Sequence, residues 1–155
     1  DLTPREITDP SEYPRGEGWN MKSKSGDLRG QEILPDHLDS IQKGDIVLMT
    51  SPFTGLESPW LSQRTAEWLI NDRQIKMLGL GALGIEWQYD LKVPSPDNSP
   101  LRRMFLGANI PIAHPLVNIE QIRSKRVIYF GLPLNFKKFE ASFIRAIAFE
   151  APEVS

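Results

Sequence analysis

The chain has 155 residues, of which 40% are apolar and 25% charged, and this composition predicts one globular domain large enough to bury a core. Its 18 Lys and Arg stand against 20 Asp and Glu with no basic cluster interleaved with aromatic residues, so we expect no nucleic-acid partner. The absence of cysteine excludes disulfides, thiolate nucleophiles and cysteine-based zinc sites, and fits a cytoplasmic location.

Residues 1–30 have the weakest periodicity in the chain. Three prolines and two glycines fall between positions 4 and 18 and interrupt helical and strand patterns alike. We predict a proline-rich extended arm or loop that lies on the body or on a partner subunit, with Tyr13 and Trp19 as candidate anchors. Residues 31–150 are the predicted domain and residues 151–155 a tail. The sequence has neither an apolar run of membrane-spanning length nor a visible leader, so we expect no membrane insertion.

Residues 33–41 predict a short helix. Pro35 suits the first helical turn, and Leu38 with Ile41 gives the segment one apolar side. His37 lies on the opposite side next to an aspartate, and we interpret it as a surface residue rather than a functional one.

Two strands and a helix are predicted over the next forty residues. The apolar run within residues 43–50 follows a turn and predicts a buried strand. Residues 58–70 predict a helix capped by Ser58 or by Ser62. Residues 75–80 predict a second buried strand.

A second helix is predicted from its cap at Ser99 to Gly107. Its apolar stripe leaves Arg102 and Arg103 away from the core. The stripe consists of Leu101, Met104, Phe105 and Ala108.

The remaining elements are short strands and one helical turn. They are a strand at 110–113, a capping-box turn at 118–121, and strands at 127–132 and 143–149, the last alternating around Arg145. Because strands and helices interleave, the predicted class is α/β, with a mixed sheet flanked by short helices; α+β is the alternative.

A glycine motif follows the strand at 75–80. Gly79, Gly81 and Gly84 have the Gly-x-Gly-x-x-Gly spacing of dinucleotide-binding proteins. That fingerprint requires a helix to open at its last glycine, whereas residues 85–93 contain no cap and are followed by two prolines. We interpret the motif as a turn where backbones approach closely, and a nucleotide-binding module is the alternative.

The sequence carries few candidate catalytic residues. It lacks a Gly-x-Ser-x-Gly elbow, a His-Glu-x-x-His pair and a phosphate-binding loop. The two histidines, His37 and His114, are too far apart to suggest a local His-rich metal site. His114 stands between a short apolar run and a proline, and the pattern leaves open whether it is a metal ligand, a catalytic base or a structural residue.

Five blocks in a fixed order cover residues 31–150. They are Gly44–Thr50, Trp60–Ile70, Ile75–Leu80, Leu101–Ile119 with its Gly-Ala-Asn-Ile-Pro-Ile core, and Gly131–Leu134 with Ser142–Ile147. In sequence and order these blocks resemble the cyclase family of metal-dependent hydrolases, which includes kynurenine formamidase and isatin hydrolase.

The resemblance implies a swivelling β/β/α fold and hydrolysis of an amide. The expected substrate is a small N-formyl or cyclic amide of the arylformamidase type, a reaction of tryptophan catabolism. A zinc or manganese ion would activate the attacking water. The family also commonly assembles as dimers or tetramers, so we expect a homo-oligomer.

The chain departs from the family at its metal ligands. The block His-x-Gly-Thr-His-x-Asp-x-Pro-x-His is absent, so the fold is expected to be incomplete at its N-terminus or to be completed by another chain. Alignment places Arg102 at a family histidine, His114 at a glutamate, Gly81 at an aspartate and Glu86 near a second acidic position. Guanidinium cannot bind a cation, whereas the imidazole of His114 can.

Two hypotheses follow from the resemblance. In the first, the chain is a hydrolase in which His114 is both metal ligand and catalytic residue, with Arg102, Glu86 and Gly81 in the pocket, and in which other ligands come from a complementary N-terminal chain. In the second, the chain is an inactive paralogue, and Arg102 with His114 forms a polar, anion-binding pocket.

Overall fold

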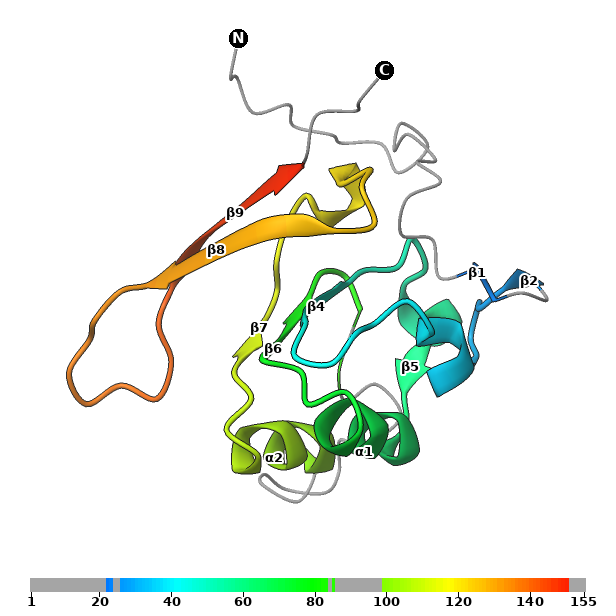
Figure 1. Cartoon of the computed structure of the whole chain (residues 1–155), viewed down its shortest axis with the longest axis horizontal. Helices are drawn as coiled ribbons and strands as arrows, with labels where there is room; N and C mark the ends of the chain where they lie inside the picture. The colour runs from blue at the N-terminus through cyan, green and yellow to red at the C-terminus, as the bar shows by residue number, and fades with distance from the viewer. Residues whose placement is uncertain (1–21, 24–25, 84, 86–98, 151–155) are drawn as a thin grey trace, which may run out of the picture.

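The computed structural model describes residues 22–23, 26–83, 85 and 99–150. Within them the fold is mixed α/β, with two α-helices, three short 3-10 helices and strands in several small sheets (Figure 1). None of the helices in these ranges has the length and apolar character needed to cross a membrane. The helices are η2 (Pro35–Leu38), η3 (Gly55–Glu57), α1 (Gln63–Asn71), α2 (Pro100–Gly107) and η4 (Ile119–Gln121).

The strands divide into four groups. A parallel sheet has the order β4-β6-β7, from β4 (Ile46–Met49), β6 (Met77–Leu80) and β7 (Ile112–Ala113). The remaining pairs are β1 (Lys22–Ser23) with β2 (Gly26–Asp27), β3 (Glu32–Ile33) with β5 (Trp60–Leu61), and β8 (Val127–Pro133) with β9 (Ile144–Glu150).

The central sheet confirms the predicted strands at 43–50, 75–80 and 110–113. Leu78 and Leu80 of β6 are fully buried, as are most side chains of β4. Parallel strands covered on both faces carry such continuous apolar runs. The register pairs Met49 with Leu80 and Gly79 with Ala113, so the three strands end close together.

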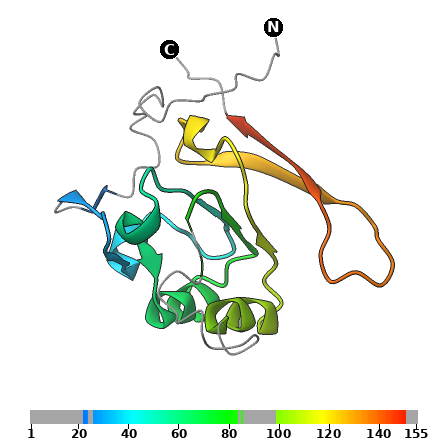
Figure 2. The ribbon, with the colours of Figure 1, turned by 180° about the vertical axis from the view of Figure 1, so that it is seen from behind.

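The two α-helices lie side by side against the sheet (Figures 1 and 2). Phe105 and Leu101 of α2 are fully buried, as is Leu69 of α1. Ser62 is the cap of α1, because its hydroxyl accepts a hydrogen bond from the Thr65 N–H at 3.2 Å. The alternative cap Ser58 is therefore wrong: the chain forms β5 before the helix begins.

Three local predictions need correction. Residues 33–41 form only a four-residue 3-10 helix, in which the Leu34 N–H donates to Nδ1 of His37 at 3.0 Å. His37 thus stabilises a turn. Ala108 is exposed, because α2 ends before it. Asn118 has a left-handed backbone and forms no capping box; its side chain instead accepts a hydrogen bond from Nε2 of Gln121 at 3.2 Å.

The predicted single mixed sheet is also wrong. β8 and β9 pair only with each other among the described strands and form an antiparallel hairpin apart from β4-β6-β7. Figures 1 and 2 show this hairpin across the central sheet from the two α-helices, with its long loop projecting to one side of the molecule. We call β8, β9 and residues 134–143 between them the arm; it is distinct from the proline-rich segment predicted for residues 1–30. β8 and β9 satisfy their backbone hydrogen bonds by pairing with each other across the hairpin, and not by joining the central sheet.

The structure predicts that alanine substitutions at two neighbouring residues of α2 change the free energy of unfolding by very different amounts. Phe105→Ala removes a side chain with 0% exposure and should lower the free energy of unfolding by about 3–5 kcal/mol, because it leaves a cavity. Leu106→Ala removes a side chain that is 56% exposed and should change it by about 0.5 kcal/mol at most. Urea unfolding followed by circular dichroism measures both; equal losses would contradict the position of α2.

Candidate functional site

The carboxyl ends of the three parallel strands meet at one edge of the central sheet. Thr50 follows β4, Gly81 follows β6 and His114 follows β7. The Gly81 N–H donates to the Met49 carbonyl at 2.8 Å, and the Leu116 N–H donates to the Leu80 carbonyl at 2.7 Å. We call Thr50, Gly81 and His114 the carboxyl edge. Ligands of open α/β sheets bind outside the carboxyl ends of the strands, so this edge is the candidate site.

The glycine motif is a place of close approach, as the sequence predicts. A Cβ atom on Gly79 would lie 2.5 Å from Cδ2 of Leu48 and 2.8 Å from Cδ1 of Leu116. A Cβ atom on Gly81 would lie 2.6 Å from Oγ1 of Thr50. Gly84 lies outside the described residues, so the nucleotide-binding alternative stays a prediction.

The positive charge of Arg102 acts on His114, which lies at the carboxyl edge. Arg102 lies in the first turn of α2 and His114 directly follows β7. Partial burial of the imidazole lowers the pKa of His114 below its usual 6.5, and the positive charge of Arg102 lowers it further. Both side chains remain exposed to solvent. His114 is therefore mainly neutral at pH 7, beside a permanent cation.

Of the four predicted site residues, Gly81 and His114 lie at the carboxyl edge, and Arg102 lies in α2 and affects His114 through its charge. Glu86, the fourth, lies outside the described residues. The sequence analysis missed Thr50, which is 8% exposed and packs against Gly81. The sequence signal that could have located Thr50 is a hydroxyl residue at the end of an apolar strand. Ser51 is also buried, and its Oγ accepts a hydrogen bond from the Phe53 N–H at 3.0 Å.

The described residues at this edge do not by themselves fit a divalent metal. No group of three or more His, Cys, Asp or Glu side chains that could hold a metal occurs in the described ranges. The charge of Arg102 repels a cation from His114. At Gly81 the space that an aspartate side chain would need is filled by Thr50 and the Leu116 carbonyl oxygen. A zinc or manganese site here would need ligands from beyond the described ranges.

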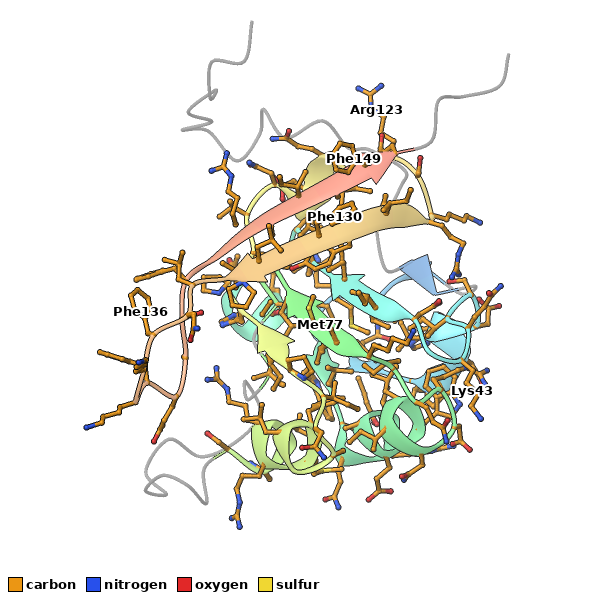
Figure 3. All side chains as sticks on the ribbon, turned by 60° about the vertical axis from the view of Figure 1, so that its left-hand side comes forward. Lys43, Met77, Arg123, Phe130, Phe136 and Phe149 are labelled. Carbon is orange, nitrogen blue, oxygen red and sulfur yellow. The ribbon has the colours of Figure 1, made fainter. Side chains whose placement is uncertain are left out.

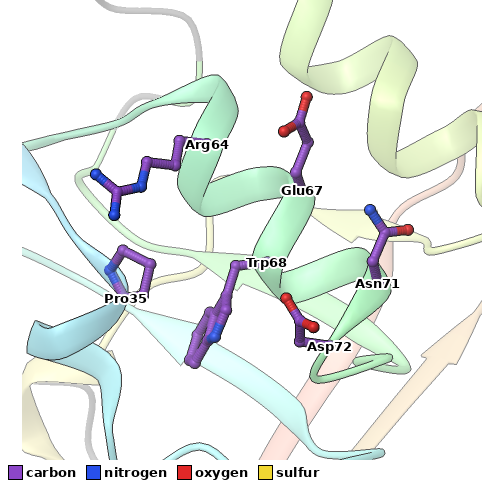
Figure 4. Close-up of a pocket in the computed structure, with 6 residues that line it drawn as sticks. All are labelled: Pro35, Arg64, Glu67, Trp68, Asn71 and Asp72. Atoms are coloured by element: carbon purple, nitrogen blue, oxygen red, sulfur yellow. The ribbon is translucent and has the colours of Figure 1, made fainter.

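A hollow of about 400 Å³ lies between η2 and α1, apart from the carboxyl edge (Figure 4). The labelled side chains point in different directions over an open surface and carry charges of both signs. Trp68 on its floor is stacked with Arg73, whose guanidinium carbon lies 4.4 Å from the ring centroid. Because the charges do not converge on one point, we do not assign a ligand to this hollow.

Comparison with known proteins found no matching family model, no matching curated protein and no matching solved structure. The resemblance to the cyclase family therefore stays a prediction.

Gly81→Ala should destabilise the protein because its Cβ atom meets the buried Thr50 side chain and the Leu116 backbone oxygen. We expect a loss of about 1–3 kcal/mol in the free energy of unfolding. Gly107→Ala is the matched control: its Cβ atom meets nothing within 4 Å, and it should be neutral or stabilising by up to about 1 kcal/mol. Thermal or urea unfolding measures both, and a neutral Gly81→Ala would refute the close approach.

Arg102→Gln should raise the pKa of His114 towards its usual value without restoring it, because burial is the larger cause of the shift. Since the folded-state pKa lies below the unfolded one, the wild type loses stability as the pH falls from about 6.5 through the folded pKa, and the variant should lose less. NMR titration of the His114 ring protons measures the pKa. Arg103→Gln serves as control, and an equal effect of both variants would contradict the pairing.

Proposed function

We propose that the carboxyl edge binds a small organic anion, a carboxylate by preference, between Arg102 and His114. The observation that carries this proposal is the electrostatic effect of Arg102 on His114, which follows β7 where the three parallel strands end. It corresponds to the second hypothesis from the sequence, in which a polar pocket replaces a metal site.

The chemistry of Arg102 suits a carboxylate. Guanidinium presents five N–H donors in a planar fork that matches the two carboxylate oxygens. With five donors, the side chain can bind a ligand and still keep contacts within the protein. Arg102 is exposed at the beginning of α2, so an anion can reach it from solvent.

His114 adds a hydrogen bond and a pH dependence. The neutral imidazole that prevails at pH 7 has one donor and one acceptor nitrogen. A bound anion partly cancels the repulsion from Arg102 and favours the protonated imidazole. Binding therefore takes up a proton, and the affinity for the anion should increase as the pH falls from 7 towards the folded-state pKa of His114.

Benzoate and benzamide test this proposal as a matched pair, because they share a ring and differ in charge. Benzoate should shift the NMR signals of His114 but not those of His37, and benzamide should shift neither. Arg102→Gln should weaken benzoate binding about tenfold or more, the value of a charged hydrogen bond, whereas Arg103→Gln should leave it nearly unchanged. Equal responses to the two compounds would refute an anion site.

A metal-dependent amide hydrolase of the cyclase type is the second candidate function. The observation in its favour is that the blocks of the resemblance fall, in order, on β4, α1, β6, α2 with β7, and the two strands of the arm. Its zinc or manganese ligands would have to come from beyond the described residues or from a complementary chain. We assign no chemical step to it.

Elemental analysis and an activity assay separate the two candidates. For an anion-binding protein we expect no stoichiometric zinc or manganese and no hydrolysis of N-formylkynurenine. Bound metal together with turnover that is lost in His114→Ala would replace the anion-binding proposal by the hydrolase.

A further inference from the structure

The arm presents a row of exposed apolar side chains. The strand register places Ile128 opposite Phe149, and Phe130 opposite Ile147. In a hairpin these residues share one face, because successive side chains alternate between faces. All four are between 43% and 65% exposed, and Leu132 beyond them is 67% exposed. We call these five residues, together with Arg145 opposite Leu132, the outer face.

The opposite face of the arm is covered to a greater extent. Five of its eight residues are partly buried, and the Tyr129 hydroxyl is buried enough to raise the pKa of that group. The partly buried residues are Val127, Tyr129, Gly131, Ile144 and Ala146. This distribution reverses the usual pattern of a solvent-facing hairpin, in which the outward residues are polar. Figure 3 shows the arm beside the central sheet, with Phe130 and Phe149 on its neighbouring strands.

The arm is held to the body at its base. Arg126 donates two hydrogen bonds to the carboxylate of Asp45, at 2.5 and 3.2 Å. Glu150 closes the same end by accepting hydrogen bonds from the N–H groups of Arg123 and Ser124. Within the described residues no third strand pairs with β8 or β9. A lone two-stranded ribbon is marginally stable in water, and the arm has cover on one face only, since the outer face is exposed.

The exposed apolar surface continues into the loop. Leu134, Phe136, Phe139 and Phe143 are between 48% and 84% exposed, and the rings of Phe136 and Phe139 lie 5.7 Å apart. With about 200 Å² for a fully exposed large side chain, the outer face and loop together expose on the order of 1,000 Å² of apolar surface. Scattered apolar residues on a monomer rarely form so large a patch.

We propose that the outer face of the arm packs against the same face of a second copy of this chain. A stable interface buries about 800 Å² on each partner, and the outer face together with the apolar residues of the loop offers that area. A twofold contact also requires a surface that is complementary to itself. The outer face meets that requirement in its central part, where Phe130 and Ile147 are both apolar.

Arg145 is the one charged residue of the outer face, and its position is compatible with this twofold contact. Arg145 lies at the loop end of the face and Phe149 at the base end. A twofold axis through the centre brings Arg145 of each copy over the base end of the other. The two guanidinium groups are then kept apart, and each lies near the aromatic ring of Phe149, an arrangement that is attractive. The proposal does not depend on the anion site.

Sedimentation equilibrium of the ligand-free chain tests the proposal. The wild type should be a dimer at micromolar concentration. The double variant Phe130→Asp, Ile147→Asp should associate at least about 30-fold more weakly, as expected when central apolar contacts are lost. Val117→Asp is the matched control, because Val117 is 80% exposed and lies outside the arm; this variant should remain dimeric. A monomeric wild type, or a dimer that the double variant leaves intact, would overturn the proposal.

Disulfide trapping gives a second readout that does not depend on the stability of a charged variant. Because the chain contains no cysteine, Ile147→Cys introduces a single thiol close to the proposed axis. Oxidation should convert this variant to a covalent dimer at least tenfold faster than Val117→Cys, and equal rates would contradict the interface. Vesicles of phosphatidylcholine and phosphatidylserine should not retain the wild type; retention of a monomer would assign the arm to a lipid surface instead.

Discussion

The close approach of β6 to its neighbours is the constraint on which the rest of the structure depends. At Gly79 and Gly81 there is no space for a side chain, because β4 on one side and the segment after β7 on the other fill it. A larger residue would have to displace the Leu48 and Leu116 side chains at position 79 and the Thr50 side chain at position 81. The glycines therefore let neighbouring segments pack directly over β6, next to the carboxyl ends of the three parallel strands. The core packs on this sheet, with Phe105 and Leu101 of α2 as its largest contribution from a helix.

The same spacing determines the chemistry of the carboxyl edge. A glycine after β6 removes the position from which an acidic side chain could project, while α2 returns a positive charge to the end of β7. In the function that we propose, Arg102 and His114 bind an anion at this edge. In that proposal the imidazole is a hydrogen-bonding group and a proton acceptor, which is a different role from that of a metal ligand.

The sequence predicted the individual helices and strands better than it predicted which strands pair. Apolar runs located β4 and β6, and the cap at Ser62 and the stripe of α2 were readable because each depends on neighbours within a few residues. Strand pairing depends on distant contacts, so nothing in residues 127–149 indicated that they form a separate hairpin. For the site, the resemblance assigns Gly81, Arg102 and His114 to one place, and that assignment stays a prediction. The packing of Thr50 against Gly81 depends on two strands that only the fold brings together, so the sequence did not indicate it.

Asp45 joins the two parts of the molecule. Its backbone carbonyl accepts a hydrogen bond from the Lys76 N–H at 2.8 Å, just before β6, while its carboxylate holds Arg126 at the base of the arm. Partial burial alone would raise its pKa, but the hydrogen bonds from Arg126 and the Gln42 N–H outweigh burial and keep the pKa below its usual value. The carboxylate of Asp45 therefore links the start of the central sheet to the base of the arm. In a pair of chains joined through their arms, this ion pair would lie between the shared interface and the central sheet of each copy.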